Sequence, residues 1–272
     1  RHAVVSSAYP HFGEESVLQG WNGSGTIFFG LCNLRCVFCQ NWDISQQKRG
    51  WDLKAEEIAD LMLKLQNETK CHNVNFVTPE HVVPQVIEAI ALAVEGGLRV
   101  PIVYNTSSYD SLRSLELLDG LVDIYMPDFK FWREDTSARL CKARDYPSVT
   151  RAAITEMHRQ VGDLVFDQHG LAKCGLLVRH LVMPGHAGEA RDILTWLHSL
   201  SPDTYVNVME QYRPTHKVGT GEQRTRSGFT KYEDIDRPVE ISEVNEIKQF
   251  ARDIGLMRLE DMELINRPIT EM

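Results

Sequence analysis

The feature that most constrains the fold of this 272-residue chain is a regular alternation of short apolar runs with amphipathic segments. Apolar runs predict six strands, at 25–31, 73–77, 98–105, 121–127, 175–184 and 204–210. Segments with apolar residues every three or four positions predict helices at 52–66, 84–97, 109–119, 147–161, 187–200 and 240–254. Strands that alternate with helices are typical of βαβ units and a parallel sheet.

Six such units are compatible with two architectures, a partial barrel and an open doubly wound sheet. The length of the chain fits one domain of either kind. In both architectures the functional groups lie at the carboxyl ends of the strands. The polar segment 215–237 predicts a loop before the last helix.

The composition of the chain limits the kinds of partner that it is expected to bind. The formal net charge of −9 argues against nucleic acid as a partner, because phosphate neutralisation needs clustered Lys and Arg. No apolar run is long enough to span a membrane and no secretory signal is visible, so we expect a cytoplasmic protein. The chain starts at Arg1 without an initiator Met, and we expect that an upstream segment was removed.

Half of the six cysteines fall within eight positions, directly after the first predicted strand. Cys32, Cys36 and Cys39 have the spacing C-x3-C-x2-C, and thiolates favour zinc or iron–sulfur clusters. A structural zinc site normally needs a fourth protein ligand, for which His72 is a candidate. Three cysteine ligands suit a [4Fe–4S] cluster instead, in which one iron has no protein ligand and can bind another group. Three buried core cysteines are the third alternative.

Polar side chains at the ends of the later strands are candidate site residues. They are Thr78 and Glu80 after the second strand, Asn105, Thr106 and Ser107 at the third, Asp128 and Lys130 at the fourth, Arg179 inside the fifth and Asn207 in the sixth. Helix capping is the alternative for the first two sets, and a surface ion pair for Asp128 and Lys130. The period of two places Arg179 and His180 on opposite faces, and we expect His180 to be structural.

The cysteine motif, with Phe38 as the aromatic residue before Cys39, resembles the signature of the radical S-adenosylmethionine (SAM) superfamily. The surrounding sequence is similar to the sequences of the branch related to pyruvate formate-lyase activating enzymes. The segments that resemble it are "SGTIFF", "CNLRCVFCQN", "HFGEE", "VTPEHVVPQ", "VYNTSSY", "VDIYMPDFK", "VRHLVMPGH" and "VNVMEQYRP". Together they run from about residue 10 to 214.

The resemblance implies an α/β fold, a partial (β/α)6 barrel of parallel strands with a C-terminal loop–helix extension. It divides the chain into an N-terminal extension at 1–24, a core barrel at 25–214 and a C-terminal loop and helix at 215–272.

The resemblance also implies a mechanism. A [4Fe–4S] cluster on Cys32, Cys36 and Cys39 binds SAM at its open iron, and one electron from a donor such as flavodoxin or ferredoxin cleaves SAM. The resulting 5′-deoxyadenosyl radical removes hydrogen from a small-molecule or peptide substrate. Cofactor-binding residues would be Phe38, Asn41, Thr78, Glu80, Asn105, Thr106, Ser107, Asp128 and Lys130, and catalytic residues Asp128, Lys130 and Arg179.

One departure from the family pattern concerns Thr78, Pro79 and Glu80, which stand where the family often has a glycine-rich segment ending in Glu. Because the glycines are absent, the backbone must approach the cofactor differently. Two other functions remain open: an activase that makes a glycyl radical on a partner protein, and a non-catalytic binding protein stabilised by zinc or a cluster.

Overall fold

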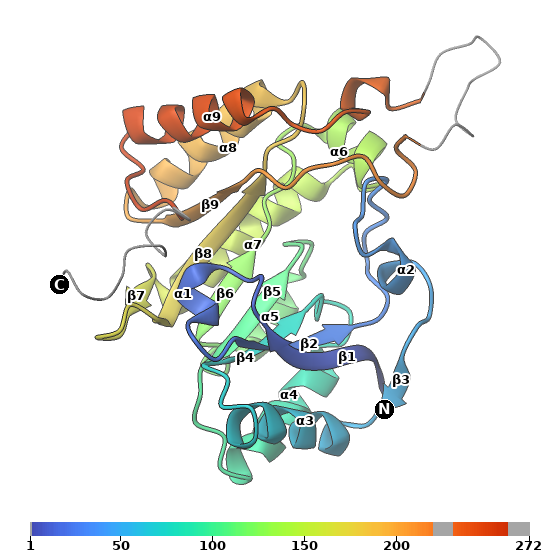
Figure 1. Ribbon diagram of the computed structural model, residues 1–272, viewed down its shortest axis with the longest axis vertical. Coiled ribbons are helices and arrows are strands. Elements are labelled where there is room, and N and C mark those ends of the chain that lie inside the picture. Colours follow the sequence, from blue (N-terminus) through green and yellow to red (C-terminus); the bar gives the residue numbers. More distant parts are fainter. Residues whose placement is uncertain (1, 220–230, 261–272) are drawn as a thin grey trace.

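The computed structural model describes residues 2–219 and 231–260 as an α/β fold with mostly parallel strands in one open sheet (Figure 1). Its strands are β1 (Ala3–His11), β2 (Ser24–Phe29), β3 (Trp51–Leu53), β4 (Val74–Val77), β5 (Ile102–Thr106), β6 (Ile124–Pro127), β7 (Val165–Phe166), β8 (Ala172–Leu181) and β9 (Tyr205–Met209). They are ordered β3-β1-β2-β4-β5-β6-β8-β7, and β9 also pairs with β8.

The six predicted strands are confirmed as β2, β4, β5, β6, β8 and β9, and each pairs in parallel with the next. The additional strands β1, β3 and β7 are antiparallel to their neighbours. β1 lies inside the segment expected to be an extension, and it pairs along β2 in a register that includes Tyr9 with Thr26. Its sequence mixes Ser and Pro with apolar residues, so it lacks the apolar run that identified the other strands.

The six predicted helices are confirmed with small shifts at their ends: α3 (Ala55–Asn67), α4 (Val83–Glu95), α5 (Leu112–Leu118), α7 (Tyr146–Val161), α8 (Ala187–Leu200) and α9 (Ile241–Asp253). Four short helices among the described residues were not predicted: α1 (Ser16–Gln19), α2 (Trp42–Ser45), α6 (Glu134–Leu140) and the 3-10 helix η2 (Glu233–Ile235) inside the predicted loop. One or two turns show too little periodicity to be recognised. Of the predicted loop at 215–237, positions 220–230 lie outside the described residues.

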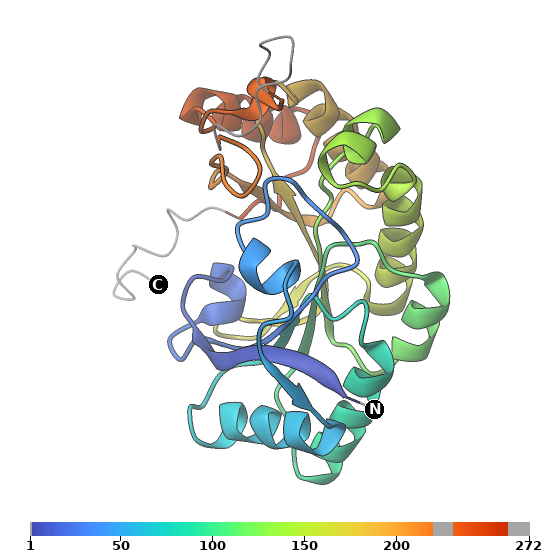
Figure 2. The same ribbon diagram turned by 90° about the vertical axis from the view of Figure 1, so that its right-hand side faces the viewer.

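The sheet has helices on its outer face, while α1 lies on the inner side (Figure 2). Alternate strand residues pack outward into the main core, among them Tyr104, Tyr125, Val178 and Val206. Their neighbours form a smaller inner core with Leu18 of α1, among them Val103, Ile124, Leu177 and Tyr205. Leu18 is fully buried there, which stabilises the fold by roughly 2 kcal/mol and closes the inner side at this level.

The same alternation positions the polar residues. Asn105, Arg179 and Asn207 each stand two positions beyond an inner-core residue, so they share its face of the sheet. Asp128 forms an isolated bridge with Arg179, which pairs in turn with Asn207. The inner face therefore carries a polar layer above an apolar one. Across the described ranges, no helix is both long and apolar enough to cross a membrane.

Candidate active site at the carboxyl end of the sheet

The three clustered cysteines lie on the loop between β2 and α2, which we call the cysteine loop (residues 30–41). Its backbone is held by α6, because the Arg35 N–H donates to the Cys141 carbonyl at 3.1 Å and the Val37 N–H to the Leu140 carbonyl at 2.9 Å. Leu31, directly before Cys32, has a φ of 72°, a conformation that costs energy for a non-glycine residue. The loop is thus fixed in a strained turn that follows the first parallel strand.

Each thiol of the cysteine loop is at least partly buried and already has a partner. The Cys36 thiol lies 3.4 Å from the Cys141 sulfur, and the Cys39 sulfur lies 3.2 Å from the Ser45 hydroxyl. Burial raises the pKa of Cys32 and Cys39, and the contact with Cys141 together with burial raises the pKa of Cys36. Binding of iron or zinc would have to displace these protons.

The donor chemistry of the cysteine loop fits an iron–sulfur cluster. Ligands to a cluster bind different iron atoms and surround a larger body than one ion. Three soft thiolates on one anchored loop are a suitable donor set for it.

Glu80 presents an unused carboxylate oxygen beside this loop. Its side chain is buried, and Oε1 accepts hydrogen bonds from the backbone N–H of Ser107 at 2.8 Å and from the Ser107 hydroxyl. Oε2 is buried without a hydrogen-bond partner. The adjacent His81 contacts this loop, with its Nε2 2.9 Å from the Gly30 carbonyl, and the charge of Glu80 contributes, after burial, to the raised pKa of Cys32. An ammonium group bound here would complete the hydrogen bonding of Glu80.

Neither Thr78 nor Glu80 caps α4, because its N-cap is Val82 and has no side-chain cap, although Pro84 does lie in the first turn of this helix. Thr78 instead has a φ of 60°, the left-handed conformation that glycine adopts at no cost. The chain therefore achieves with a strained Thr the backbone turn for which glycine would be expected. This turn directs Glu80 toward Ser107.

The three polar residues at the end of β5 point in different directions. Asn105 Oδ1 accepts a hydrogen bond from Arg179 Nη2 at 2.6 Å on the inner face. Thr106 points outward, where its hydroxyl donates to Asp110 Oδ2 at 2.6 Å. The structure thus brings Asn105 and Ser107 to the site but does not bring Thr106 there. None of the three caps α5, whose N-cap is Ser111.

Asp110 is a buried acid that the sequence did not single out. Burial, followed by the charge of Glu80, raises its pKa to about 7, while hydrogen bonds from Thr106 and Tyr104 act in the opposite direction. The charge of Glu80 thus acts on the carboxyl group of Asp110, which Tyr104 and Thr106 hold in place.

A buried ionic group forms the centre of the polar layer, and we call it the Arg179 group: Arg179, Asp128, Lys130, Glu14, Glu15 and Asn105. Arg179 Nε donates to Asp128 Oδ1 at 2.8 Å, and Nη1 lies 3.3 Å from Glu14 and 3.8 Å from Glu15. Lys130 Nζ donates to Asp128 Oδ2 at 2.6 Å. Both Asp128 and Lys130 are more than three-quarters buried, so the surface-pair alternative is wrong.

The pKa values reflect this arrangement. Burial alone would raise the pKa of Asp128, but the charges of Arg179 and Lys130 bring it below its ordinary value. Burial would lower the pKa of Lys130, but Asp128 and then Cys36 raise it well above the ordinary value. Lys130 is therefore a permanent cation close to the cysteine loop. Burial and the charge of Glu15 raise the pKa of Glu14 to about 8, although Arg179 opposes them.

Three other candidates have clear positions. Phe38 is buried with its ring edge-on to Phe131 and Tyr212, as a packing residue beneath the cysteine loop. Asn41 is exposed and lines a cavity of about 480 Å³ together with Asn105 and Arg179. The structural assignment of His180 is confirmed, because its buried Nδ1 donates to the Phe129 carbonyl at 2.7 Å.

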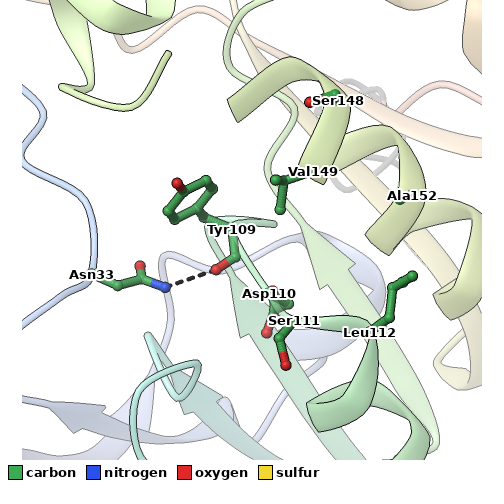
Figure 3. Close-up of a pocket in the computed structure, with 8 residues that line it drawn as sticks. All are labelled: Asn33, Tyr109, Asp110, Ser111, Leu112, Ser148, Val149 and Ala152. Carbon is green, nitrogen blue, oxygen red and sulfur yellow. Dashed lines mark hydrogen bonds between the residues drawn. The ribbon is translucent and has the colours of Figure 1, made fainter. Parts of the chain in front are cut away.

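Three cavities surround these groups. The cavity of about 480 Å³ and a second one of about 680 Å³ share Gly13, Glu14 and Arg179, so the Arg179 group lies between them. A third cavity, of about 490 Å³, shares no residue with either and lies between α5 and α7 (Figure 3). In Figure 3, Asn33 of the cysteine loop reaches toward this cavity and donates to the Tyr109 carbonyl at 2.7 Å. This contact fixes the loop to the segment before α5.

Glu14 and Glu15 are the main site residues that sequence reasoning missed. They belong to "HFGEE", a segment noted for its resemblance and not for its chemistry. Two adjacent acids after a run that forms β1 could have indicated a site, had β1 been recognised as part of the sheet.

Comparison with known proteins identifies the family. Residues 26–197 match the Radical SAM superfamily, and they include all three clustered cysteines, Glu80 and most of the Arg179 group. The chain therefore belongs to the radical SAM superfamily and is an enzyme of the radical-SAM type. Membership implies an iron–sulfur cluster and SAM as its cofactors.

Among individual proteins, the chain is 31% identical to Uncharacterized protein MJ0674 of Methanocaldococcus jannaschii, over 89% of this chain and 68% of that protein. Two solved structures share the fold at low identity. Streptococcus suis SuiB is 10% identical with a TM-score of 0.55, over 85% of this chain and 46% of SuiB. HydG, a maturase of the [FeFe]-hydrogenase, is 11% identical with a TM-score of 0.57, over 90% of this chain and 52% of HydG. The chain thus spans about half the length of these two structures.

Proposed function

We propose that this enzyme uses a [4Fe–4S] cluster on Cys32, Cys36 and Cys39 to cleave SAM reductively and to abstract hydrogen from a small-molecule or peptide substrate. The observation that best supports the proposal is the buried, unpartnered Oε2 of Glu80 next to the cysteine loop. When bound, the cluster and SAM supply a 5′-deoxyadenosyl radical, which removes a hydrogen atom from the substrate.

The residues around the loop have distinct roles in this proposal. Glu80 accepts hydrogen bonds from the methionine ammonium group of SAM and is itself oriented by Ser107. Lys130, a permanent cation near Cys36, offsets part of the negative charge of three thiolates. Tyr146 accepts a hydrogen bond from the backbone N–H of Lys130 at 3.0 Å and keeps this strand end in place.

Asp128 and Arg179 lie on the inner face of the site. Asn105 and Arg179 line the cavity of about 480 Å³ that also borders Asn41, and their polar groups suit the ribose and carboxylate of SAM. The apolar layer beneath them, closed by Leu18, excludes water from below. Exclusion of water matters because a radical must meet only the intended C–H bond.

The activating-enzyme branch, the electron donor and a glycyl-radical partner remain predictions from the resemblance. The proposed substrate is therefore a small molecule or a peptide.

The test is anaerobic reconstitution with iron and sulfide, reduction with dithionite in the presence of SAM, and measurement of 5′-deoxyadenosine. We expect the product from the native chain and none from Cys36→Ala, which should also fail to hold four irons and four sulfides. Cys71→Ala is the matched control, because Cys71 is buried away from the loop beside Thr69.

Three results would contradict the proposal. Retention of the full iron and sulfide content by Cys36→Ala would remove the assigned ligand set. Release of a SAM fragment other than 5′-deoxyadenosine would show that another bond is cleaved, and zinc binding without a cluster would favour the non-catalytic alternative.

A further inference from the structure

Each sulfur of the three clustered cysteines contacts a hydrogen-bonding group that is not one of the proposed ligands. The pairs are Cys32 with the Leu34 N–H at 3.3 Å, Cys36 with the Cys141 thiol at 3.4 Å, and Cys39 with the Ser45 hydroxyl at 3.2 Å. The proposed ligand set is therefore matched by a second set of groups that carry hydrogen. Two of these groups, Ser45 and Cys141, are side chains that can be replaced.

The direction of the two side-chain contacts depends on the protons of the cysteines. In the free protein the Cys36 thiol donates to Cys141, and either partner of the contact between Cys39 and Ser45 could donate. A cysteine binds iron as a thiolate, so binding removes the hydrogen from Cys36 and Cys39. Only Ser45 and Cys141 then carry a hydrogen for these contacts. Each becomes a donor to a negatively charged sulfur, and such charge-assisted hydrogen bonds are the stronger kind.

Neither donor has a competing partner in the part of the chain that the structure describes. Cys141 is fully buried and Ser45 is 8% exposed, so water does not replace the sulfurs as acceptors. Among residues 2–219 and 231–260, the Ser45 hydroxyl and the Cys141 thiol have no hydrogen-bond partner besides Cys39 and Cys36. Because buried polar groups are normally hydrogen-bonded, both groups should direct their hydrogen at the two sulfurs.

Backbone contacts hold both donors against the cysteine loop without involving its sulfurs. Ser45 is the last residue of α2, and the next residue, Gln46, donates from Nε2 to the Cys36 carbonyl at 3.1 Å. Cys141 directly follows α6, and its carbonyl accepts the hydrogen bond from the Arg35 N–H at 3.1 Å. The positions of Ser45 and Cys141 therefore do not depend on whether the sulfurs carry protons or iron.

Donors at ligand sulfurs affect how easily an iron–sulfur cluster accepts an electron. Hydrogen bonds to the sulfurs are one of the factors that set the reduction potential of such clusters. The reduced cluster carries one more negative charge than the oxidised one, so a donor stabilises the reduced form more. Groups that touch metal ligands in this way also fix the orientation of the ligands.

We propose that Ser45 and Cys141 are positioning residues of this enzyme, which donate hydrogen bonds to the sulfurs of Cys39 and Cys36 and thereby raise the reduction potential of the cluster. This inference rests on the proposed function, since it takes Cys36 and Cys39 as cluster ligands. Ser45 contributes more than Cys141, because a hydroxyl is a stronger donor than a thiol.

The test is an anaerobic redox titration of the reconstituted protein without SAM, followed by electron paramagnetic resonance of the reduced cluster. We expect Ser45→Ala to make one-electron reduction roughly tenfold less favourable, which is a downward shift of about 59 mV in the midpoint potential. Cys141→Ala should lower the potential by less. Iron and sulfide contents, measured for each variant, should stay at the native values because neither residue is a ligand.

Three further variants separate hydrogen bonding from packing. Ser45→Thr and Cys141→Ser keep a donor, so they should return the potential toward the native value, which a merely structural role would not produce. The matched control is Thr69→Val. The Thr69 hydroxyl lies 3.2 Å from the Cys71 sulfur, the same separation as between Ser45 and Cys39, but Cys71 is not a proposed ligand. Thr69→Val should therefore leave the potential unchanged.

A native potential in both alanine variants would overturn the inference, as would an equal fall in the variants that keep a donor. Loss of the cluster from both alanine variants would also overturn it, because the two residues would then be needed to hold the cluster. If one alanine variant alone loses the cluster, the potential of the other decides. A native cluster whose potential ignores both residues refutes this inference alone, whereas a native chain that forms no [4Fe–4S] cluster refutes the proposed function.

Discussion

Replacement of Arg179 by Met should lower the free energy of unfolding far more than the same replacement of an exposed arginine. The guanidinium lies 2.8 Å from Asp128, 3.3 Å from Glu14 and 3.8 Å from Glu15, and its side chain is 13% exposed. Without it, the ionised Asp128 and Glu15 would have only Lys130 as a cation within the Arg179 group, since Glu14 holds a proton near neutral pH. Removing one partner of a buried ionic group costs about 3–5 kcal/mol in the free energy of unfolding.

The matched control is Arg159→Met. Arg159 pairs with Asp119 and Glu156, but its side chain is 58% exposed, so solvent screens both pairs and the loss should be much smaller than in Arg179→Met. Both variants are compared with the native chain by urea denaturation, followed by circular dichroism under anaerobic conditions at pH 7.5.

The pH dependence of the free energy of unfolding tests whether Arg179→Met loses stability for electrostatic reasons. Arg179 holds the pKa of Asp128 below its ordinary value, so this stabilisation is present at neutral pH and is lost as the pH falls through the folded pKa. The difference between Arg179→Met and the native chain should therefore shrink toward acid pH. The reasoning is refuted if Arg179→Met costs no more than Arg159→Met, and a large loss independent of pH would indicate packing instead.

Two further substitutions test the strain and the protonation described above. Thr78→Gly should raise the free energy of unfolding by up to about 1 kcal/mol, because Thr78 has a φ of 60°. The control Thr106→Gly should lower the free energy of unfolding, because Thr106 has no positive φ and its hydroxyl bonds Asp110. Thermal denaturation of both variants measures the difference. The raised pKa of Glu14, about 8, means that the folded state holds a proton that the unfolded state releases above its ordinary pKa, so stability should fall as the pH rises toward 8. Glu14→Gln should flatten this fall in urea titrations between pH 5 and 8, and an unchanged slope would contradict the assignment.

The sequence predicted the parts of the fold that depend on repeated patterns. Apolar runs and helical periodicity identified the six parallel strands and the long helices, and the period of two correctly separated Arg179 from His180. The strand β1 was missed because its pairing with β2 depends on contacts with a distant segment, which a local pattern does not contain.

The candidate site was predictable only where residue types are rare or grouped. Three cysteines within eight positions are such a group, and strand-end positions identified Glu80, Asn105 and Asp128. The outward direction of Thr106 follows from the period of two, but its partner Asp110 was not predictable because it lies on the following loop. Glu14 and Glu15 required knowledge that the chain returns from β1 across the inner face to reach Arg179.

The pairing of β1 with β2 has a consequence for how this enzyme can be shortened. The family match begins at residue 26, but β2 would then lose the strand that covers its edge from Val5 to His11. An uncovered edge offers unpaired N–H and carbonyl groups to other chains, which promotes aggregation. The same cut would remove Leu18 from the inner core and both acids from Arg179, leaving an unbalanced buried cation. The smallest unit able to fold and function must therefore include the first two dozen residues, in contrast to the boundary that family similarity alone suggests.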